Sequence, residues 1–159
     1  MGIRVASVVI GAVVVFASVV GSGGEEAEAA PRLPRAAGWD GKSTFSCDRG
    51  SHVFEGLDVE VRGVGVSTSG TCRVVLKNCK ISATHVGISS SGSSSVVLQG
   101  GQVSGLVGVS ASGSSNVDLN NAKVSGAISV MASGSANVDA RSATLAGRVD
   151  KSGSATVRR

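Results

Sequence analysis

Aromatic side chains are scarce in this sequence, which has no tyrosine, one tryptophan and three phenylalanines among 159 residues. Trp39, Phe45 and Phe54 gather in one stretch, and no aromatic residue follows them. Rings gathered in this way are expected to plug one end of an apolar core. A later group of basic side chains has no aromatic neighbours on which bases could stack, which disfavours nucleic-acid binding and favours a solvated face. These basic residues are Arg73, Lys77 and Lys80.

The sequence also lacks the residue combinations that common enzymes need. Asp118 and Asp139, the clearest carboxylate pair, occupy equivalent positions in successive sequence repeats and lie among short Ser, Gly and Asn turns, and the serines have no base nearby. Asn116 and Asn137 beside these acids offer further oxygen ligands for Ca²⁺, but Arg158 is placed to neutralise Asp139. We therefore expect a protein that is not an enzyme, with no catalytic residues and no cofactor or metal.

Only three cysteines are present, and none forms a Cys-x₂-Cys pair. This spacing disfavours a zinc site with His52 or His85, and each histidine is expected at the surface beside a turn. The candidates for a disulfide are Cys47, Cys72 and Cys79, which allow one bridge. A Cys47–Cys72 bridge is favoured, while Cys72–Cys79 pairing and the absence of any bridge stay open.

The longest apolar run, Val5 to Val20, is too short for a comfortable membrane span. Arg4 precedes it, and a small-x-small cleavage site follows at Ala27 to Ala29, so residues 1–29 are predicted to be a secretory signal. An uncleaved membrane anchor is the alternative. Residues 30–43 hold both prolines and are predicted to be a flexible basic linker. This organisation predicts a protein that is secreted, periplasmic or on the cell surface, with a β-helix over 44–159.

Glycine and serine, by contrast, are abundant and regularly placed. Ser-Gly pairs recur at nearly even spacing, and a fixed period of about 21 residues with apolar side chains in phase is typical of a solenoid. The glycines of these pairs are Gly70, Gly92, Gly113, Gly134 and Gly153.

Each repeat contains three short segments in which alternate residues are apolar, as in strands with one buried face. The first segment places valine four residues after the repeat glycine and usually leucine two residues later. The third segment is expected to turn two apolar series inward. One series is Val86, Val107, Ile128 and Val149, and the other is Ile88, Val109 and Val130.

Three strands per repeat, joined by turns too short for helices, predict an all-β fold. The specific prediction is a right-handed, three-sided parallel β-helix of about five to six coils with a 21-residue repeat. The apolar pattern degrades near the C-terminus, where charged residues are expected to form a polar cap, a fraying tail being the alternative. The cap residues are Arg148, Asp150, Lys151, Arg158 and Arg159.

The unit Ser-Gly-x-x-x-Val-x-Leu, followed by Val-Ser-Gly, resembles the right-handed parallel β-helix repeats of exported bacterial proteins from about Phe45 to Arg159. The smooth, valine-rich coils are also similar to bactofilin-type scaffold proteins, which are cytoplasmic and have no secretory signal. Because this fold hosts many activities, the resemblance implies shape more than function.

We expect a non-enzymatic exported structural, scaffold or adhesive protein that displays a β-helical rod. Its expected partner is a second copy bound end to end or a cell-envelope polymer, with membrane contact only through an uncleaved N-terminal segment. The alternative is a carbohydrate-binding or polysaccharide-cleaving β-helix at the cell surface, which a groove lined by charged or aromatic side chains would support.

Overall fold

A computed structural model of the chain describes residues 39–159. The predicted signal or anchor (1–29) and the linker up to residue 38 lie outside the described residues. Within residues 39–159 there are fifteen strands and no helix, and every strand pairing is parallel. None of these elements is therefore a helix of the length and apolarity that a membrane crossing requires.

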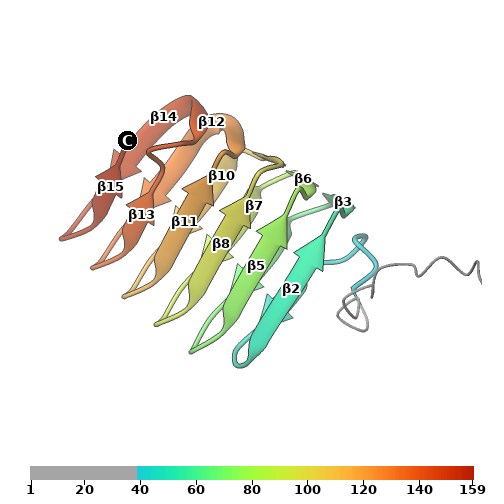
Figure 1. The fold of residues 1–159 in the computed structure, drawn as a ribbon. Coiled ribbons are helices and arrows are strands. Elements are labelled where there is room, and N and C mark those ends of the chain that lie inside the picture. Colours follow the sequence, from blue (N-terminus) through green and yellow to red (C-terminus); the bar gives the residue numbers. More distant parts are fainter. Residues whose placement is uncertain (1–38) are drawn as a thin grey trace, which may run out of the picture. The chain divides into compact units, whose positions relative to one another are not determined.

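The first side of the solenoid is a six-stranded parallel sheet, visible as the row of labelled arrows facing the reader in Figure 1. Each strand after β2 follows a Ser-Gly turn, whereas β2 follows Arg49-Gly50, and each strand pairs with its counterpart one coil away. Its strands are β2 (Ser51–Glu55), β5 (Arg73–Lys77), β8 (Ser95–Gln99), β11 (Asn116–Asn120), β13 (Asn137–Asp139) and β15 (Thr156–Arg158).

The second and third sides form one nine-stranded sheet, because two long strands run through the corner between them. The long strands are β12 (Lys123–Ala132) and β14 (Thr144–Lys151). The other strands of the second side are β3 (Asp58–Val61), β6 (Lys80–Ala83) and β9 (Gln102–Ser104). Those of the third side are β1 (Phe45–Cys47), β4 (Val64–Thr68), β7 (Val86–Ser90) and β10 (Val107–Ala111).

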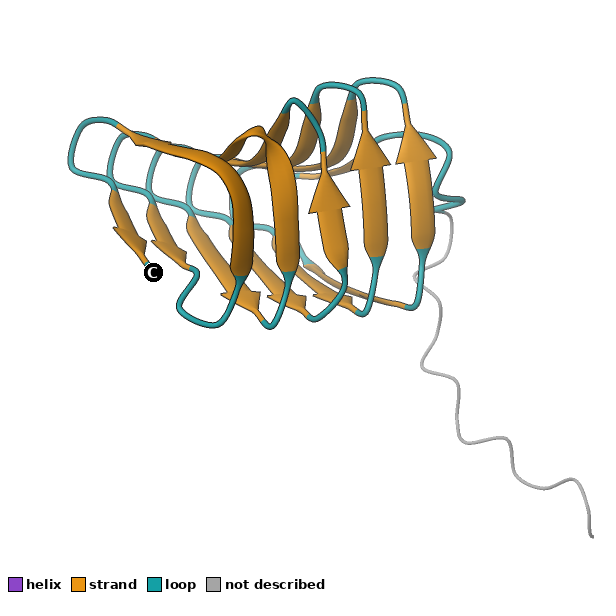
Figure 2. Ribbon diagram, turned by 90° about the horizontal axis from the view of Figure 1, so that it is seen from above, coloured by secondary structure: helices purple, strands orange, loops and turns teal. Residues whose placement is uncertain are grey.

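The predicted fold class is confirmed. The chain is an all-β parallel solenoid of about five turns, and each turn is a coil of about 21 residues. Five coils contribute a strand to every side, with β1 before them and β15 after them. Figure 2 shows how the coils stack with short connections. The core consists of stacked columns of buried side chains, and two of these columns repeat one residue type through successive coils. These two contain Val74, Val96, Val117 and Val138, and Leu76, Leu98 and Leu119.

The third side departs from the expected alternation. The inward position after Val86 is taken by Gly87, while Val86 itself is half-buried and outside the core cluster. A Cβ on Gly87 would meet Cγ1 of Val103, from the second side, so the glycine lets the two sides close tightly at their shared corner. Placing Val86, Val107 and Ile128 inward was therefore wrong, whereas Ile88 and its counterparts are buried as expected.

The last coil also shifts register. Ile128 pairs with Arg148 and Val130 pairs with Val149, with an irregularity between the two pairs. The interval between the last two repeat glycines is shorter than the earlier intervals, so the strict 21-residue match of Ile128 with Val149 does not hold. As a result, Val149 continues the buried column that contains Val130, but it is only half-buried.

The two ends of the core are finished differently. At the N-terminal end Trp39, Phe45 and Phe54 pack together with ring centroids 4.8–5.3 Å apart, as predicted for a plug. At the other end the core closes with half-buried Leu145 and Val157. The charged residues predicted to form a cap surround them, all exposed except half-buried Asp150. An ion pair of 2.7 Å joins Arg148 to Asp150.

Candidate functional site

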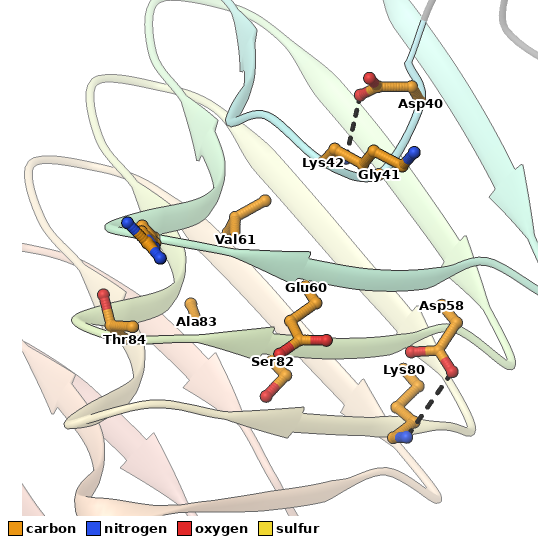
Figure 3. A pocket seen from close by; sticks show the side chains of 11 residues that line it. Asp40, Gly41, Lys42, Asp58, Glu60, Val61, Lys80, Ser82, Ala83 and Thr84 are labelled. Atoms are coloured by element: carbon orange, nitrogen blue, oxygen red, sulfur yellow. Dashed lines mark hydrogen bonds and ion pairs between the residues drawn. The ribbon is translucent and has the colours of Figure 1, made fainter.

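A hollow of about 630 Å³ lies on the outer face of the second side, over β3 and β6 (Figure 3). One wall is the turn at Asp40, whose Oδ1 accepts hydrogen bonds from the Lys42 amide at 2.9 Å and from Ser43 Oγ at 3.3 Å. The Lys42 amide is also the main reason that the pKa of Asp40 lies below its ordinary value. The Gly41 carbonyl accepts a hydrogen bond from the Glu60 amide, which fixes this turn to the edge of β3.

The hollow is lined by side chains of both charges. Asp58 and Lys80 form an ion pair of 3.6 Å, but both are largely exposed, so the pair contributes little to stability. Glu60 and Arg62 form no ion pair with any residue of the described range. A polar ligand with hydroxyl groups or mixed charges fits this lining better than an apolar one. The site was missed at the sequence level because its signal, Asp-Val-Glu-Val-Arg over 58–62, looks like an ordinary solvated strand.

The cysteines lie at the N-terminal end of the solenoid, where Cys47 and Cys72 form a disulfide with Cα atoms 6.0 Å apart. This is the favoured pairing of the sequence analysis. Cys79 is free and buried in the core, and burial raises the pKa of its thiol.

His52 lies in a different position from the surface turn expected for it. His52 pairs with Val74, so it stands on the inward valine column and is half-buried against Phe45, with a ring-centroid distance of 5.2 Å. Predicting His52 at the surface was therefore wrong, whereas His85 is exposed beside a turn as expected. The His52 ring and the sulfurs of Cys47 and Cys72 offer ligand atoms that all lie within 4.8 Å of one another.

The corner next to the disulfide is lined by buried hydroxyl groups. Thr68 follows Cys47 on one column, and Ser94 follows Cys72 on the next. The Thr68 and Ser94 hydroxyls are buried and 3.1 Å apart, and the Ser90 hydroxyl lies 2.9 Å from Ser94. Because these hydroxyls satisfy one another, the corner stays polar without leaving unpaired groups.

Asp118 and Asp139 stack on adjacent strands of the first side, as the 21-residue interval predicts. The partner of Asp139 is Arg141, whose Nε donates to Oδ1 at 2.9 Å. That hydrogen bond is the largest cause of the lowered pKa of Asp139, with a smaller contribution from the charge of Arg158. Asp139 is thus neutralised mainly by Arg141, two residues further along the chain, and Arg158, the residue expected to neutralise it, has the smaller effect.

Comparison with known proteins adds no functional information, because no protein family, no curated protein and no solved structure matches this chain.

Proposed function

We propose that the protein is an exported, non-enzymatic structural or scaffold protein whose solenoid acts as a stackable rod. The observation that carries the proposal is where the unpaired strand edges lie. Within residues 39–159 each inner strand has a paired strand on both sides, so edges without a paired strand occur only at the two ends. They belong to β1 and β2 at one end, where the turn at Gly41 covers part of the edge of β3, and to β14 and β15 at the other. Such edges are templates for pairing with another chain.

The two ends are complementary in strand content. The first coil is preceded by β1, a strand of the third side, and the last is followed by β15, a strand of the first side. If a second copy stacks head to tail, β15 lies beside β2 of the next copy and the end of β14 lies beside its β1. The partial coils then contribute different sides and do not compete for the same place.

The charges of the two ends also favour head-to-tail contact. Residues 40–62 contain five acidic and three basic side chains, whereas residues 139–159 contain two acidic and five basic ones. Opposite net charge at the two ends favours a heterologous contact, which propagates into open filaments, over a two-fold contact between identical ends.

Cysteine cross-linking tests the head-to-tail contact. Ser51 and Thr156 are exposed at opposite ends of one column on the first side. In-register stacking of two copies would place the Cα atoms of Ser51 and Thr156 about 4.8 Å apart, within the range that a disulfide can bridge. The full-length chain in mild detergent, with Cys79→Ala to remove the free thiol, is prepared as Ser51→Cys and as Thr156→Cys. Mixing the two variants should give a disulfide-linked dimer, and the doubly substituted chain should give a ladder of multimers.

The controls separate three arrangements. Neither single variant alone should cross-link, and Asn116→Cys, in the middle of the same column, should not cross-link with Ser51→Cys. Dimers of the Thr156→Cys chain alone would point to a two-fold contact between C-terminal ends. An absence of cross-links in every mixture would contradict the stacking proposal.

Export is supported by the apolar run of residues 5–20 and by the Cys47–Cys72 disulfide, since disulfides persist mainly in oxidising compartments. Residues 1–38 fused to a reporter enzyme that is active only after export should produce activity. Activity equal to that of a reporter without a leader would contradict this part of the proposal.

Carbohydrate or envelope-polymer binding is the second candidate, and the charged lining of the hollow over β3 and β6 favours it. Co-sedimentation with insoluble acidic and neutral polysaccharides tests it. Glu60→Gln and Arg62→Gln should weaken retention, while Lys123→Gln, on the same side but outside the hollow, should not. Equal retention of all three variants would show that the hollow is not the binding site.

A further inference from the structure

We propose that Cys47, His52 and Cys72 form a zinc-binding site when the Cys47–Cys72 disulfide is reduced. The metal-bound and disulfide-bonded forms would then be alternative states of the same end of the solenoid. This inference is independent of the proposed function, because all three ligands come from one chain and the site needs neither a second copy nor an outer face.

The first argument is the position of the three ligand atoms. They come from three separate places, the end of β1, the inward face of β2 and the residue directly before β5, yet they all lie within 4.8 Å of one another. Tetrahedral zinc with Zn–S bonds of about 2.3 Å and Zn–N bonds of about 2.0 Å needs ligand atoms roughly 3.5 Å apart. Once the sulfur–sulfur bond is broken, small side-chain movements produce that spacing without moving the backbone.

The second argument is the unusual presence of an imidazole on this column. The next coils use Val74, Val96, Val117 and Val138 at the position of His52. None of the residues in the described part of the chain hydrogen-bonds the His52 ring, although the ring is half-buried. A purely apolar plug needs no nitrogen there, whereas a metal site does.

The surroundings favour a neutral metal complex. Cys47 and Cys72 are buried, and the rings of Phe45 and Phe54 lie 5.2 and 6.4 Å from the His52 ring. Burying a charged group in such a place is costly unless it is compensated. Two thiolates balance the two positive charges of zinc, and a neutral imidazole adds none. Water takes the fourth position, on the side open to solvent.

The chemistry balances with a dithiol reductant. The reductant gives two electrons and two protons to the Cys47–Cys72 bond, which becomes two thiols, while its own two sulfurs form a disulfide. Zinc then displaces both thiol protons to solvent and accepts a lone pair from the His52 ring. Reoxidation requires release of the metal, because each sulfur cannot keep both bonds.

Cobalt(II) is a suitable spectroscopic probe for this site. The full-length Cys79→Ala chain is reduced with a phosphine under anaerobic conditions and titrated with Co²⁺. One equivalent should bind, with the visible absorption of tetrahedral cobalt and a thiolate charge-transfer band, and Zn²⁺ should displace it. Two protons should be released per Zn²⁺ bound. The oxidised chain should show neither signal.

His52→Val, which installs the residue of the neighbouring coils, should weaken Co²⁺ binding at least about tenfold and alter its spectrum. His85→Val is the matched control, because His85 is exposed and outside the cluster, and it should bind like the parent chain. Circular dichroism checks that each reduced chain is folded. A folded, reduced parent chain that binds no Co²⁺, or a His52→Val variant that binds as tightly as the parent, would overturn the proposal.

Discussion

Gly87→Ala tests how tightly the coils close at the corner between the second and third sides. Gly87 lies in β7 with ordinary extended backbone, so alanine causes no backbone strain, and any cost comes from space. The added Cβ would overlap Cγ1 of Val103 and lie 2.6 Å from the carbonyl oxygen of Gly108 on the next strand. The Val103 side chain can adjust, but the carbonyl belongs to a strand with neighbours on both sides.

The expected destabilisation is about 3 kcal/mol, the upper end of the range for inserting one methyl group into a packed core. For a folded unit of this size such a loss lowers Tm by about 10 °C. The assay is thermal unfolding followed by the far-ultraviolet circular dichroism of the strands, with the parent chain measured in parallel.

Ser89→Ala is the matched control, because Ser89 lies two residues later on the same strand and faces outward. It should change stability by no more than about 0.5 kcal/mol. In the double variant Gly87→Ala/Val103→Ala the overlap with Cγ1 disappears, so its destabilisation should be smaller than the sum of the two single effects. A Gly87→Ala chain that melts within about 2 °C of the parent would refute the inward glycine position.

Three further substitutions test other parts of the structure. Val117→Asp puts an unpaired charge in a fully buried column and should destabilise the fold by several kcal/mol. Asp118→Ala, on the outer face of the same strand, should cost roughly 0.5 kcal/mol or less. Equal Tm shifts for the two variants would mean that the register of this strand is wrong by one residue. Cys72→Ser opens a disulfide-closed loop and should cost about 3 kcal/mol, a loss that reductant should reproduce in the parent chain only. Arg141→Ala should lower Tm at neutral pH, because the ion pair with Arg141 depresses the folded-state pKa of Asp139 below its ordinary value of 3.8. The stabilisation by this ion pair is present above that pH and fades as the pH falls through the folded-state pKa. The Tm values of the parent and the Arg141→Ala chain should therefore converge at low pH. A Tm difference between them that persists at still lower pH would contradict the role of this ion pair.

The fold was predictable because a solenoid repeats the same local problem in every coil. Valine four residues after the repeat glycine and leucine two residues later must share a face, and the 21-residue interval stacks each on its own copy. The register of Val117 between Val96 and Val138 therefore follows from the sequence alone. The sequence favoured the Cys47–Cys72 pairing without excluding its alternatives, because the separation of 25 residues is slightly more than one coil.

The corners were less predictable because alternation stops at a bend. Gly87 and Ile88 are consecutive residues that both face inward, and only the space available at the corner decides that Gly87, and not Val86, takes the inward position. The recurring Val-Gly-Val and Val-Gly-Ile tripeptides were a usable signal, since a glycine repeated in one position indicates close approach. His52 was misplaced for a different reason: a histidine directly after a Ser-Gly-like turn looks exposed until the register assigns it to the valine column.

The corner between the third and first sides shows how one packing problem is solved differently along the chain. The first pair of positions there holds the Cys47–Cys72 disulfide, and the following coil holds the hydroxyl contact between Thr68 and Ser94. By Ala111 the same column is filled by a methyl group. The connection thus changes from covalent to hydrogen-bonded to purely apolar.

This gradient has a physical basis in how a solenoid buries its residues. A coil in the middle is covered on both sides, so apolar packing alone holds it, whereas a terminal coil is covered on one side and needs additional interactions. The N-terminal coil has a disulfide and an aromatic plug, while the C-terminal coil has only half-buried Leu145, Val149 and Val157 among charged side chains. The C-terminal end would therefore gain more stability than the N-terminal end from being covered. The head-to-tail contact of the proposed function would cover it with a second copy.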